Sequence, residues 1–154
     1  MAAYFNGGLM KAVIQRVMNA SVQVDGKVVG AIDQGILIYL GIIQGDTKKQ
    51  AEDLAEKIVR FRIFPDHQGK MNLSLLEVQG KALIVSQFTL AADGKKGNRP
   101  SFDLAALPDQ AIPLYEQFIQ KIRSFNIHAE TGIFGAHMNV IATNHGPVTF
   151  CLEK

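Results

Sequence analysis

The sequence has little of what marks secreted, metal-dependent or membrane-spanning proteins. It contains one cysteine, Cys151, so no internal disulfide can form, and its four histidines are scattered without the spacing of metal ligands. No apolar run reaches the length of a membrane span, and no basic segment followed by a long apolar stretch marks a targeting peptide. These absences predict a soluble protein of a reducing compartment, the cytoplasm, without a structural zinc or another cofactor.

Charge of neither sign is in large excess. Lys and Arg number 16 and Asp and Glu number 14, which gives a formal net charge of +2. This balance argues against a nonspecific nucleic-acid binder. Local basic clusters can still contact phosphate in a nearly neutral protein, so the partner must be inferred from motifs.

Apolar residues, by contrast, are abundant, at 47% of 154 residues. Such a chain can fill one core but is too short for two comfortable domains. Residues 1–9 contain Gly7 and Gly8 and show no periodicity, whereas an alternating apolar run begins just after Met10. We therefore expect a disordered extension over residues 1–9, with Met10 as the natural start, and one folded domain over residues 10–154.

Hydrophobic periodicity predicts many strands and two main helices. Helical spacing with an N-cap at Asp46 or Thr47 predicts a helix that ends near Phe61, and a second helix is expected from Pro108 to about Phe125. The inner face of the second helix should hold its apolar side chains: Ile112, Tyr115, Phe118, Ile119 and Ile122. Strand-like runs cover residues 11–17, 21–25, 28–32, 35–43, 83–88, 129–130, 138–142 and 148–152.

The order of these elements predicts the fold class. The run over residues 35–43 is apolar throughout, which is typical of a central strand buried on both faces. Helices and strands do not alternate strictly, so a doubly wound sheet is not expected. We expect an α/β protein, a single-domain layered sandwich of mixed, largely antiparallel β-sheets with two main helices.

Polar side chains gather at the end of a predicted buried strand, where residues 86–90 read Ser-Gln-Phe-Thr-Leu. Such strand ends often present reacting groups. Strand alternation would send Ser86 and Phe88 to one face and Gln87 and Thr89 to the other, so their side chains cannot all converge. Backbone N–H groups at this end could supply an oxyanion hole for acyl transfer. Alternatively, Ser86 and Thr89 only satisfy nearby backbone groups.

A conventional catalytic triad has little support. Ser86 or Thr89 would need an adjacent base, and none stands close in the sequence. His145 is the best placed of the four histidines, although a histidine in a loop is more often simply solvated. The chain also lacks a Gly-x-Ser-x-Gly elbow. This leaves chemistry performed by backbone dipoles and by a group on the substrate.

A second segment, residues 144–149, reads Asn-His-Gly-Pro-Val-Thr between two apolar strand-like runs. An X-Pro bond is the one peptide bond that is readily cis, and Gly146 before Pro147 leaves the backbone bare. Its N–H and C=O groups could touch a ligand directly. Taken alone, the segment is better explained as an ordinary turn between strands.

Together the two segments resemble the motifs of the D-aminoacyl-tRNA deacylases, the D-tyrosyl-tRNA deacylase family. Residues 86–90 resemble its Ser-Gln-Phe-Thr motif and residues 144–149 its Asn-x-Gly-Pro-x-Thr motif, in the same order and with the same separation. The similarity covers residues 10–154. Other stretches that take part in it are residues 11–17, 69–73 and 131–136.

The resemblance implies a homodimeric cytoplasmic hydrolase. Its substrate would be the ester that joins a D-amino acid, or glycine mischarged on tRNA-Ala, to the tRNA 3′ end. It implies a cis Gly146-Pro147 bond that reaches into the partner subunit's active site, where its carbonyls hold the amino group and exclude an L side chain. Because D and L amino acids carry the same groups, rejection of one needs something immovable where its side chain would go.

The resemblance also implies roles for individual residues. Backbone N–H groups of Gln87 and Phe88, in the segment that Ser86 opens, would lie near the ester carbonyl while the ribose 2′-OH assists. Thr89 would then be pocket wall. A non-catalytic tRNA-binding module and a small-ester hydrolase with Thr89 as nucleophile remain as alternatives.

Supporting residues come from three further places. Arg16 resembles the family arginine that holds the Gly-Pro loop, a task suited to a guanidinium that donates to two carbonyls, although a solvated surface arginine is equally compatible with the sequence. Asn144 opens the Gly-Pro motif. Ala136 and Met138 could line the pocket, while a methionine in an apolar strand is more often simply core.

Basic residues follow the first motif in the sequence. Lys95, Lys96 and Arg99 occupy a polar loop directly after the predicted catalytic strand. They could hold the phosphates of the tRNA acceptor stem. Most lysine pairs in loops only aid solubility, which is the alternative here.

Overall fold

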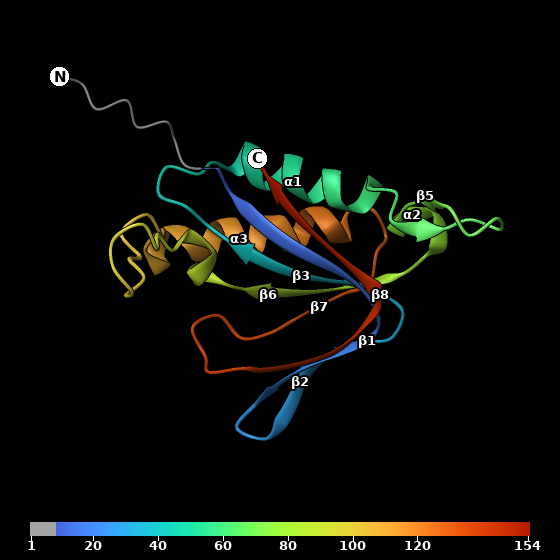
Figure 1. Cartoon of the computed structure of the whole chain (residues 1–154), viewed down its shortest axis with the longest axis horizontal. Coiled ribbons are helices and arrows are strands. Elements are labelled where there is room, and N and C mark those ends of the chain that lie inside the picture. The colour runs from blue at the N-terminus through green and yellow to red at the C-terminus, as the bar shows by residue number, and fades with distance from the viewer. Residues whose placement is uncertain (1–8) are drawn as a thin grey trace.

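The largest element of the fold is a six-stranded mixed sheet (Figure 1). The computed structural model describes residues 9–154. The strands of this sheet are β1 (Lys11–Val24), β2 (Lys27–Ile32), β3 (Gly35–Gly41), β6 (Lys81–Ser86), β7 (Ala129–Thr131) and β8 (Asn139–Glu153). A separate hairpin consists of β4 (Phe64–Pro65) and β5 (Met71–Leu73). The helices are α1 (Lys48–Arg60), α2 (Leu75–Val78), the 3-10 helix η1 (Phe88–Ala91) and α3 (Pro108–Arg123). Apart from Leu9, the extension expected over residues 1–9 lies outside the described residues.

Strand β1 is the centre of the sheet because both of its edges are paired along most of its length. One edge pairs antiparallel with β3 over the first half and with β2 over the second half. The other edge pairs antiparallel with β8. Beyond β3, strands β6 and β7 add in parallel, so the sheet is mixed, as expected.

The sheet curves until its ends almost meet. Gly30 in β2 lies so close to β7 that a Cβ at this position would be 2.4 Å from the carbonyl oxygen of Thr131. The fold is therefore a nearly closed, barrel-like sheet with the long helices α1 and α3 over one face (Figure 1). The prediction of a mixed α/β single domain is confirmed, whereas the expected sandwich of layered sheets is one curved sheet instead.

Two predicted strand breaks are absent. Residues 11–17 and 21–25 were expected as separate strands, but β1 runs through the exposed residues Met18 and Asn19 because its partners continue on both sides. Likewise, the runs at residues 138–142 and 148–152 belong to one strand, β8. At the end of β6 the prediction was too long, since the strand ends at Ser86 and the chain enters η1.

The helices largely follow their sequence signals. Thr47 caps α1 through a capping box with Gln50, as one of the two expected caps. Helix α3 begins at Pro108, but Ile112, expected inside, is 37% exposed because the buried stripe is centred on Ala111 and Tyr115. Among the described residues, no helix is long and apolar enough to cross a membrane.

Both faces of the central strands are buried. Ile36 and Ile38 pack toward the helices in the main core, while Leu37 packs into a second cluster on the inner side of the curved sheet. This confirms the prediction for the apolar run at residues 35–43, although β3 itself ends at Gly41. The rigid ends of β3 and β6 border the pocket described next.

Candidate functional site

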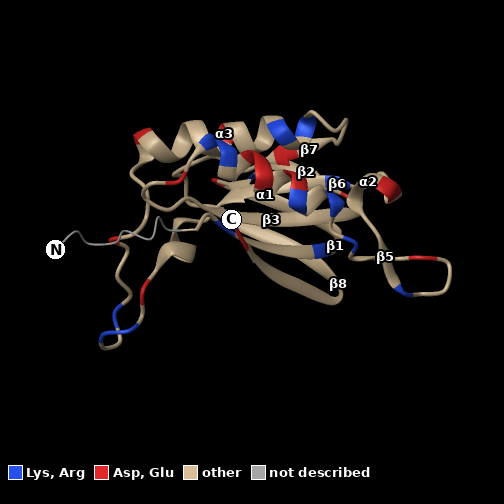
Figure 2. Cartoon of the chain, turned by 90° about the horizontal axis from the view of Figure 1, so that it is seen from above, with Lys and Arg blue, Asp and Glu red and all other residues tan. Residues whose placement is uncertain are grey.

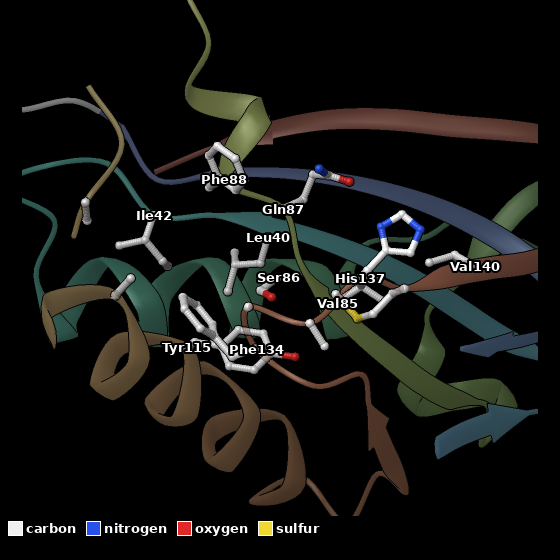
Figure 3. A pocket seen from close by; sticks show the side chains of 15 residues that line it. Leu40, Ile42, Val85, Ser86, Gln87, Phe88, Tyr115, Phe134, His137 and Val140 are labelled. Carbon is white, nitrogen blue, oxygen red and sulfur yellow. The ribbon is translucent and has the colours of Figure 1, made fainter. Parts of the chain in front are cut away.

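A pocket of about 260 Å³ opens beside the end of β6 (Figure 3). One side is the chain leaving β6, another is α3, and a third is the segment that leads into β8. This volume suits a small side chain and its neighbouring groups more than a large cofactor. The lining includes Ser86, Gln87, Phe88, Tyr115, Ala136, His137 and Met138.

The backbone changes course at Gln87. Its N–H donates to the Leu40 carbonyl at 2.8 Å, which extends the pairing of β6 with β3 by one residue. This bond corrects the expectation that the Gln87 N–H is offered to a ligand, since the sheet already uses it. The N–H groups of Phe88 and Thr89 open η1 and have no acceptor among the described residues, as expected for the first turn of a helix.

Three of the four residues of the predicted Ser-Gln-Phe-Thr motif, residues 86–89, line the pocket. Ser86 and Gln87 are half-buried, and Phe88 is 57% exposed at the rim, with its ring packed edge-to-face on Phe102 at 5.1 Å between centroids. Thr89, expected as pocket wall, is exposed and does not line the pocket, because the chain turns into η1 at this point. Its hydroxyl instead accepts a hydrogen bond from the Gln87 side-chain amide, which is not a base.

The expected pocket residues Ala136 and Met138 do lie in the lining. Two other lining residues, Tyr115 and His137, were not predicted from the sequence as pocket residues. The Tyr115 hydroxyl donates to the Ile84 carbonyl at 2.8 Å, and burial raises the pKa of Tyr115, so this phenol serves as a neutral structural donor. A tyrosine hydroxyl on a buried helix face needs such a partner, and that need was the available signal.

The structure brings His137, and not His145, to the pocket. The His137 side chain is exposed at the rim near Gln87 (Figure 3). Its position next to the predicted pocket residues Ala136 and Met138 was the signal in the sequence. Among residues 9–154, no three or more His, Cys, Asp or Glu side chains come together to hold a metal ion.

The Gly-Pro segment forms a bulge in β8. Gln15 of β1 pairs with Thr149, and Val17 pairs with Asn144, so that residues 145–148 of β8 lie opposite Arg16 alone. The Gly146-Pro147 bond is cis. A Cβ at Gly146 would lie 2.5 Å from a methyl carbon of Val148, so this position requires glycine. The expected turn between two strands is therefore a bulge within one strand, and we call its Gly146-Pro147 segment the ledge.

Arg16 ties the ledge to the body of the protein. Its Nε donates to the His145 carbonyl at 2.9 Å, and its Nη1 donates to the Ile63 carbonyl at 2.7 Å. Arg16 is only 8% exposed, which rules out the solvated surface arginine considered from the sequence. The His145 carbonyl lies in β8 just before Gly146, and the Ile63 carbonyl lies just before β4. Arg16 therefore links two segments that are distant in the chain.

Asn144 fixes the ledge from the other side. Its side-chain oxygen accepts the Val148 N–H at 2.8 Å, and its amide nitrogen donates to the Thr149 hydroxyl at 3.1 Å. This side chain therefore spans the bulge and replaces ladder hydrogen bonds that the extra residues interrupt. Between these anchors, residues 145–147 are exposed.

The ledge and the pocket lie apart within one chain. Neither Gly146 nor Pro147 lines the pocket. Arg16 pairs with Ile36, whereas Ser86 pairs with Leu40, four residues further along β3. That offset is about 13 Å along the strand direction. The two motifs therefore do not form one site in a single chain.

Lys95, Lys96 and Arg99 lie together on an exposed loop that projects from the body (Figure 2). The loop is closed at its base by two hydrogen bonds of 2.8 Å between the backbones of Asp93 and Ser101. It begins just after η1, and Phe102 beyond it packs on Phe88. The basic loop therefore stands next to the pocket rim.

Comparisons with known proteins agree on one family. A family model described as D-Tyr-tRNA(Tyr) deacylase matches residues 13–153. The chain is 59% identical over 144 residues to a D-aminoacyl-tRNA deacylase of Geotalea uraniireducens, with 94% of this chain and 93% of that protein covered. It is 55% identical over 145 residues to a D-aminoacyl-tRNA deacylase of Fervidobacterium nodosum, with 94% and 97% covered.

Two solved structures share the fold. One, titled "c-Myc DNA Unwinding Element Binding Protein", superposes with a TM-score of 0.88 at 42% identity and covers 94% of this chain and 98% of its own. The other, titled as a structural analysis of a probable eukaryotic D-amino acid tRNA deacylase, has a TM-score of 0.82 at 17% identity. The superposition covers 95% of this chain and 100% of that structure's chain, and at 17% identity it supports similarity of fold alone.

Proposed function

Because this chain belongs to the D-Tyr-tRNA(Tyr) deacylase family and is a D-aminoacyl-tRNA deacylase, we propose that it cleaves its ester with main-chain groups from two subunits of a homodimer. The observation that carries this proposal is the separation of the two motifs. The pocket at Ser86 lacks any part of the Gly146-Pro147 ledge, and the ledge is exposed. A second copy can supply to each pocket the ledge that its own chain holds elsewhere.

The ledge is suited to act as a fixed wall. Its position is set by Arg16 on one flank and Asn144 on the other, and both contacts end on groups of the ledge segment. In the partner's pocket its carbonyls accept hydrogen bonds from the substrate ammonium group. Its backbone occupies the space that an L side chain would need, so an L-aminoacyl ester cannot enter the reactive position.

Glycine escapes this selection. It has no side chain to collide with the ledge, so glycine mischarged on tRNA-Ala is a second substrate in this proposal. A pocket that rejects by steric exclusion discriminates against added groups and not against missing ones.

The reaction needs little from side chains. Water attacks the ester carbonyl carbon, and the bond from that carbon to the ribose oxygen breaks, so that the ribose oxygen leaves with the proton that the water loses. The Phe88 N–H, which has no acceptor among residues 9–154, donates to the oxyanion formed in this step. The Gln87 N–H stays in the sheet and orients this segment. The ribose 2′-OH of the substrate assists the attack, so the reaction does not need Ser86 and His137, the serine and histidine of the lining, to act as a nucleophile and base pair.

Lys95, Lys96 and Arg99 contact the acceptor-stem phosphates in this proposal. Their loop stands beside the pocket rim, through the contact of Phe102 with Phe88. Phosphate contacts of this kind add affinity without sequence selection. A tRNA substrate also agrees with the cytoplasmic location expected from the sequence.

Incubation with D-tyrosyl-tRNA and L-tyrosyl-tRNA tests the function. We expect release of D-tyrosine with a preference of roughly a hundredfold or more over L-tyrosine, because the ledge keeps the L side chain out of the reactive position. Tight binding of both without release would indicate a non-catalytic tRNA-binding module, and equal release would refute selection by the ledge. Gel filtration with light scattering checks the dimer, and a monomer active at nanomolar concentration would contradict the two-subunit site.

A further inference from the structure

A basic hollow lies at the end of α1, far from the pocket of its own chain. It is lined by Lys57, Arg60, Phe61, Arg62 and Met71, which we call the α1-end surface. The three basic side chains are exposed, and Met71 of β5 is 50% exposed. Figure 1 shows the end of α1 and the β5 hairpin on the side of the molecule opposite η1 and the loop that follows it.

The charges of this surface are mostly uncompensated. Along α1, Lys48 and Lys49 are paired with carboxylates of the same helix, and Arg60 is paired with Glu56 at 3.1 Å. Lys57 and Arg62 make no ion pair with any residue from 9 to 154. Lys57 lies over the Phe61 ring instead, 5.5 Å from its centroid. A cation held over an aromatic ring beside a free guanidinium is a suitable arrangement for a nucleic-acid phosphate and its sugar.

The α1-end surface is physically joined to the ledge. Arg16 holds both the His145 carbonyl before the ledge and the Ile63 carbonyl directly after Arg62. Phe61 packs edge-to-face on Phe150 of β8, with ring centroids 5.2 Å apart. These contacts hold the surface beside the base of the ledge, so wherever the ledge inserts, this surface flanks it.

We propose that the α1-end surface binds backbone phosphates of the tRNA 3′ strand whose aminoacyl ester lies in the partner subunit's pocket. This inference rests on the proposed insertion of the ledge into that pocket. The terminal nucleotide in the pocket continues into the RNA chain, which leaves past the flank of the inserted ledge. Lys57 and Arg62 stand on that flank, while the Lys95 loop serves the other side of the same pocket from its own chain.

A double variant, Lys57→Ala with Arg62→Ala, separates RNA contact from chemistry. With D-tyrosyl-tRNA we expect KM to rise roughly tenfold, and the dependence of log(kcat/KM) on log salt to become shallower by about two, one for each lost phosphate contact. With the D-tyrosyl ester of adenosine, which has no phosphate, kinetics should not change. The matched control is Lys48→Ala with Lys49→Ala, which removes the same amount of charge from the opposite end of α1 and should leave both substrates unaffected.

Mixed dimers test whether the contact is made across subunits. Ala136→Trp blocks a pocket. When a blocked subunit that also carries Lys57→Ala and Arg62→Ala is paired with a wild-type subunit, the working pocket lacks the neighbouring surface, and KM should rise. When the blocked subunit has an intact surface and its partner carries the double substitution, KM should stay normal. The reverse pattern would overturn the assignment to the partner's pocket.

The outcomes also separate this inference from the proposed function. An unchanged KM and salt slope in the double variant would refute the RNA contact, while the deacylase proposal would stand. Equal losses on the tRNA and adenosine esters would show that these residues support the ledge rather than bind RNA. Failure of the wild-type protein to cleave either D-ester would contradict the proposed function itself.

Discussion

Arg16 and His145 are joined by a hydrogen bond of 2.9 Å from the guanidinium Nε to the backbone carbonyl, although 129 positions separate them in the chain. The same guanidinium holds the Ile63 carbonyl at 2.7 Å. A buried side chain thus fixes the backbone that introduces Gly146. The proposed selectivity depends on this contact because the ledge that excludes an L side chain must be held in place.

Replacing Arg16 should therefore affect stability and selectivity together. Arg16→Ala leaves two carbonyls without their donor, so the free energy of unfolding should fall by about 2 kcal/mol or more. Arg16→Lys keeps a charge but can no longer donate from two fixed positions, so a smaller loss of stability and a lower preference for the D ester are expected. Urea unfolding and the ratio of kcat/KM values for D- and L-tyrosyl-tRNA measure both effects. A stable and fully selective Arg16→Ala variant would show that the ledge does not need this anchor.

Thr89→Ala tests the remaining nucleophile hypothesis. The hydroxyl is exposed, lies outside the pocket lining and accepts from an amide, so kcat should change by less than about fivefold. Loss of a true nucleophile costs on the order of 10⁴ or more in kcat. Single-turnover assays with D-tyrosyl-tRNA distinguish these magnitudes, and Thr89→Ser is the matched control because it retains the hydroxyl. A loss in Thr89→Ala that Thr89→Ser restores would establish the nucleophilic enzyme.

Gly30→Ala tests the near-closure of the sheet. The added methyl would lie 2.4 Å from the Thr131 carbonyl oxygen, and backbone on both sides leaves little room to yield. We expect the free energy of unfolding to fall by about 2–3 kcal/mol. Gly94→Ala is the control, because nothing lies within 4 Å of the added carbon there. Similar unfolding midpoints for the two variants would mean that β2 and β7 can separate freely.

Asp46 predicts a specific dependence of stability on pH. Desolvation by burial raises the pKa of its carboxyl to about 6, against an opposing hydrogen bond from the Ile43 N–H, and Oδ1 is buried with no hydrogen-bond partner among residues 9–154. Because the folded-state pKa lies above the ordinary value of 3.8, the folded protein binds this proton more tightly than the unfolded chain. The contribution to stability is greatest below about pH 4 and is lost as pH rises through 6.

Asp46→Asn should remove this dependence. The amide oxygen can still accept from Ile43, and no charge is buried at high pH. The difference in unfolding free energy, variant minus wild type, should therefore become more positive between pH 4 and pH 7. Urea titrations at several pH values measure that difference, in which the other titrating groups cancel. A flat difference curve would show that the Asp46 carboxyl is well solvated in the folded protein.

Local signals in the sequence were enough for the elements that depend on their own residues. Thr47 and Gln50 form the cap that begins α1, and the apolar run around Leu37 is buried on both faces. The strand break expected at Met18 and Asn19 was wrong, because β8 pairs with Asn19 while β3 pairs up to Val17 and β2 pairs from Ala20, so the exposed segment between them stays extended. Local pattern carries no information about such distant partners.

Most residues of the site could be predicted from the sequence, but their positions and hydrogen bonds could not. The two motifs located the pocket segment and the ledge, and Ala136 and Met138 were placed in the lining. That Gln87 commits its N–H to Leu40 depends on where β6 leaves β3, which periodicity could not fix to one residue. His137 was missed in favour of His145 because the rim is assembled from segments that are distant in the chain.

The bulge in β8 gives the ledge a particular thermal behaviour. Both flanks of the ledge are ladder pairs with β1, the strand that also carries β2 and β3. A surface loop would loosen gradually on heating, but this segment can open only when the central strand of the protein releases its partners. Chiral fidelity should consequently hold at a constant level as temperature rises and end with the cooperative melting of the whole domain.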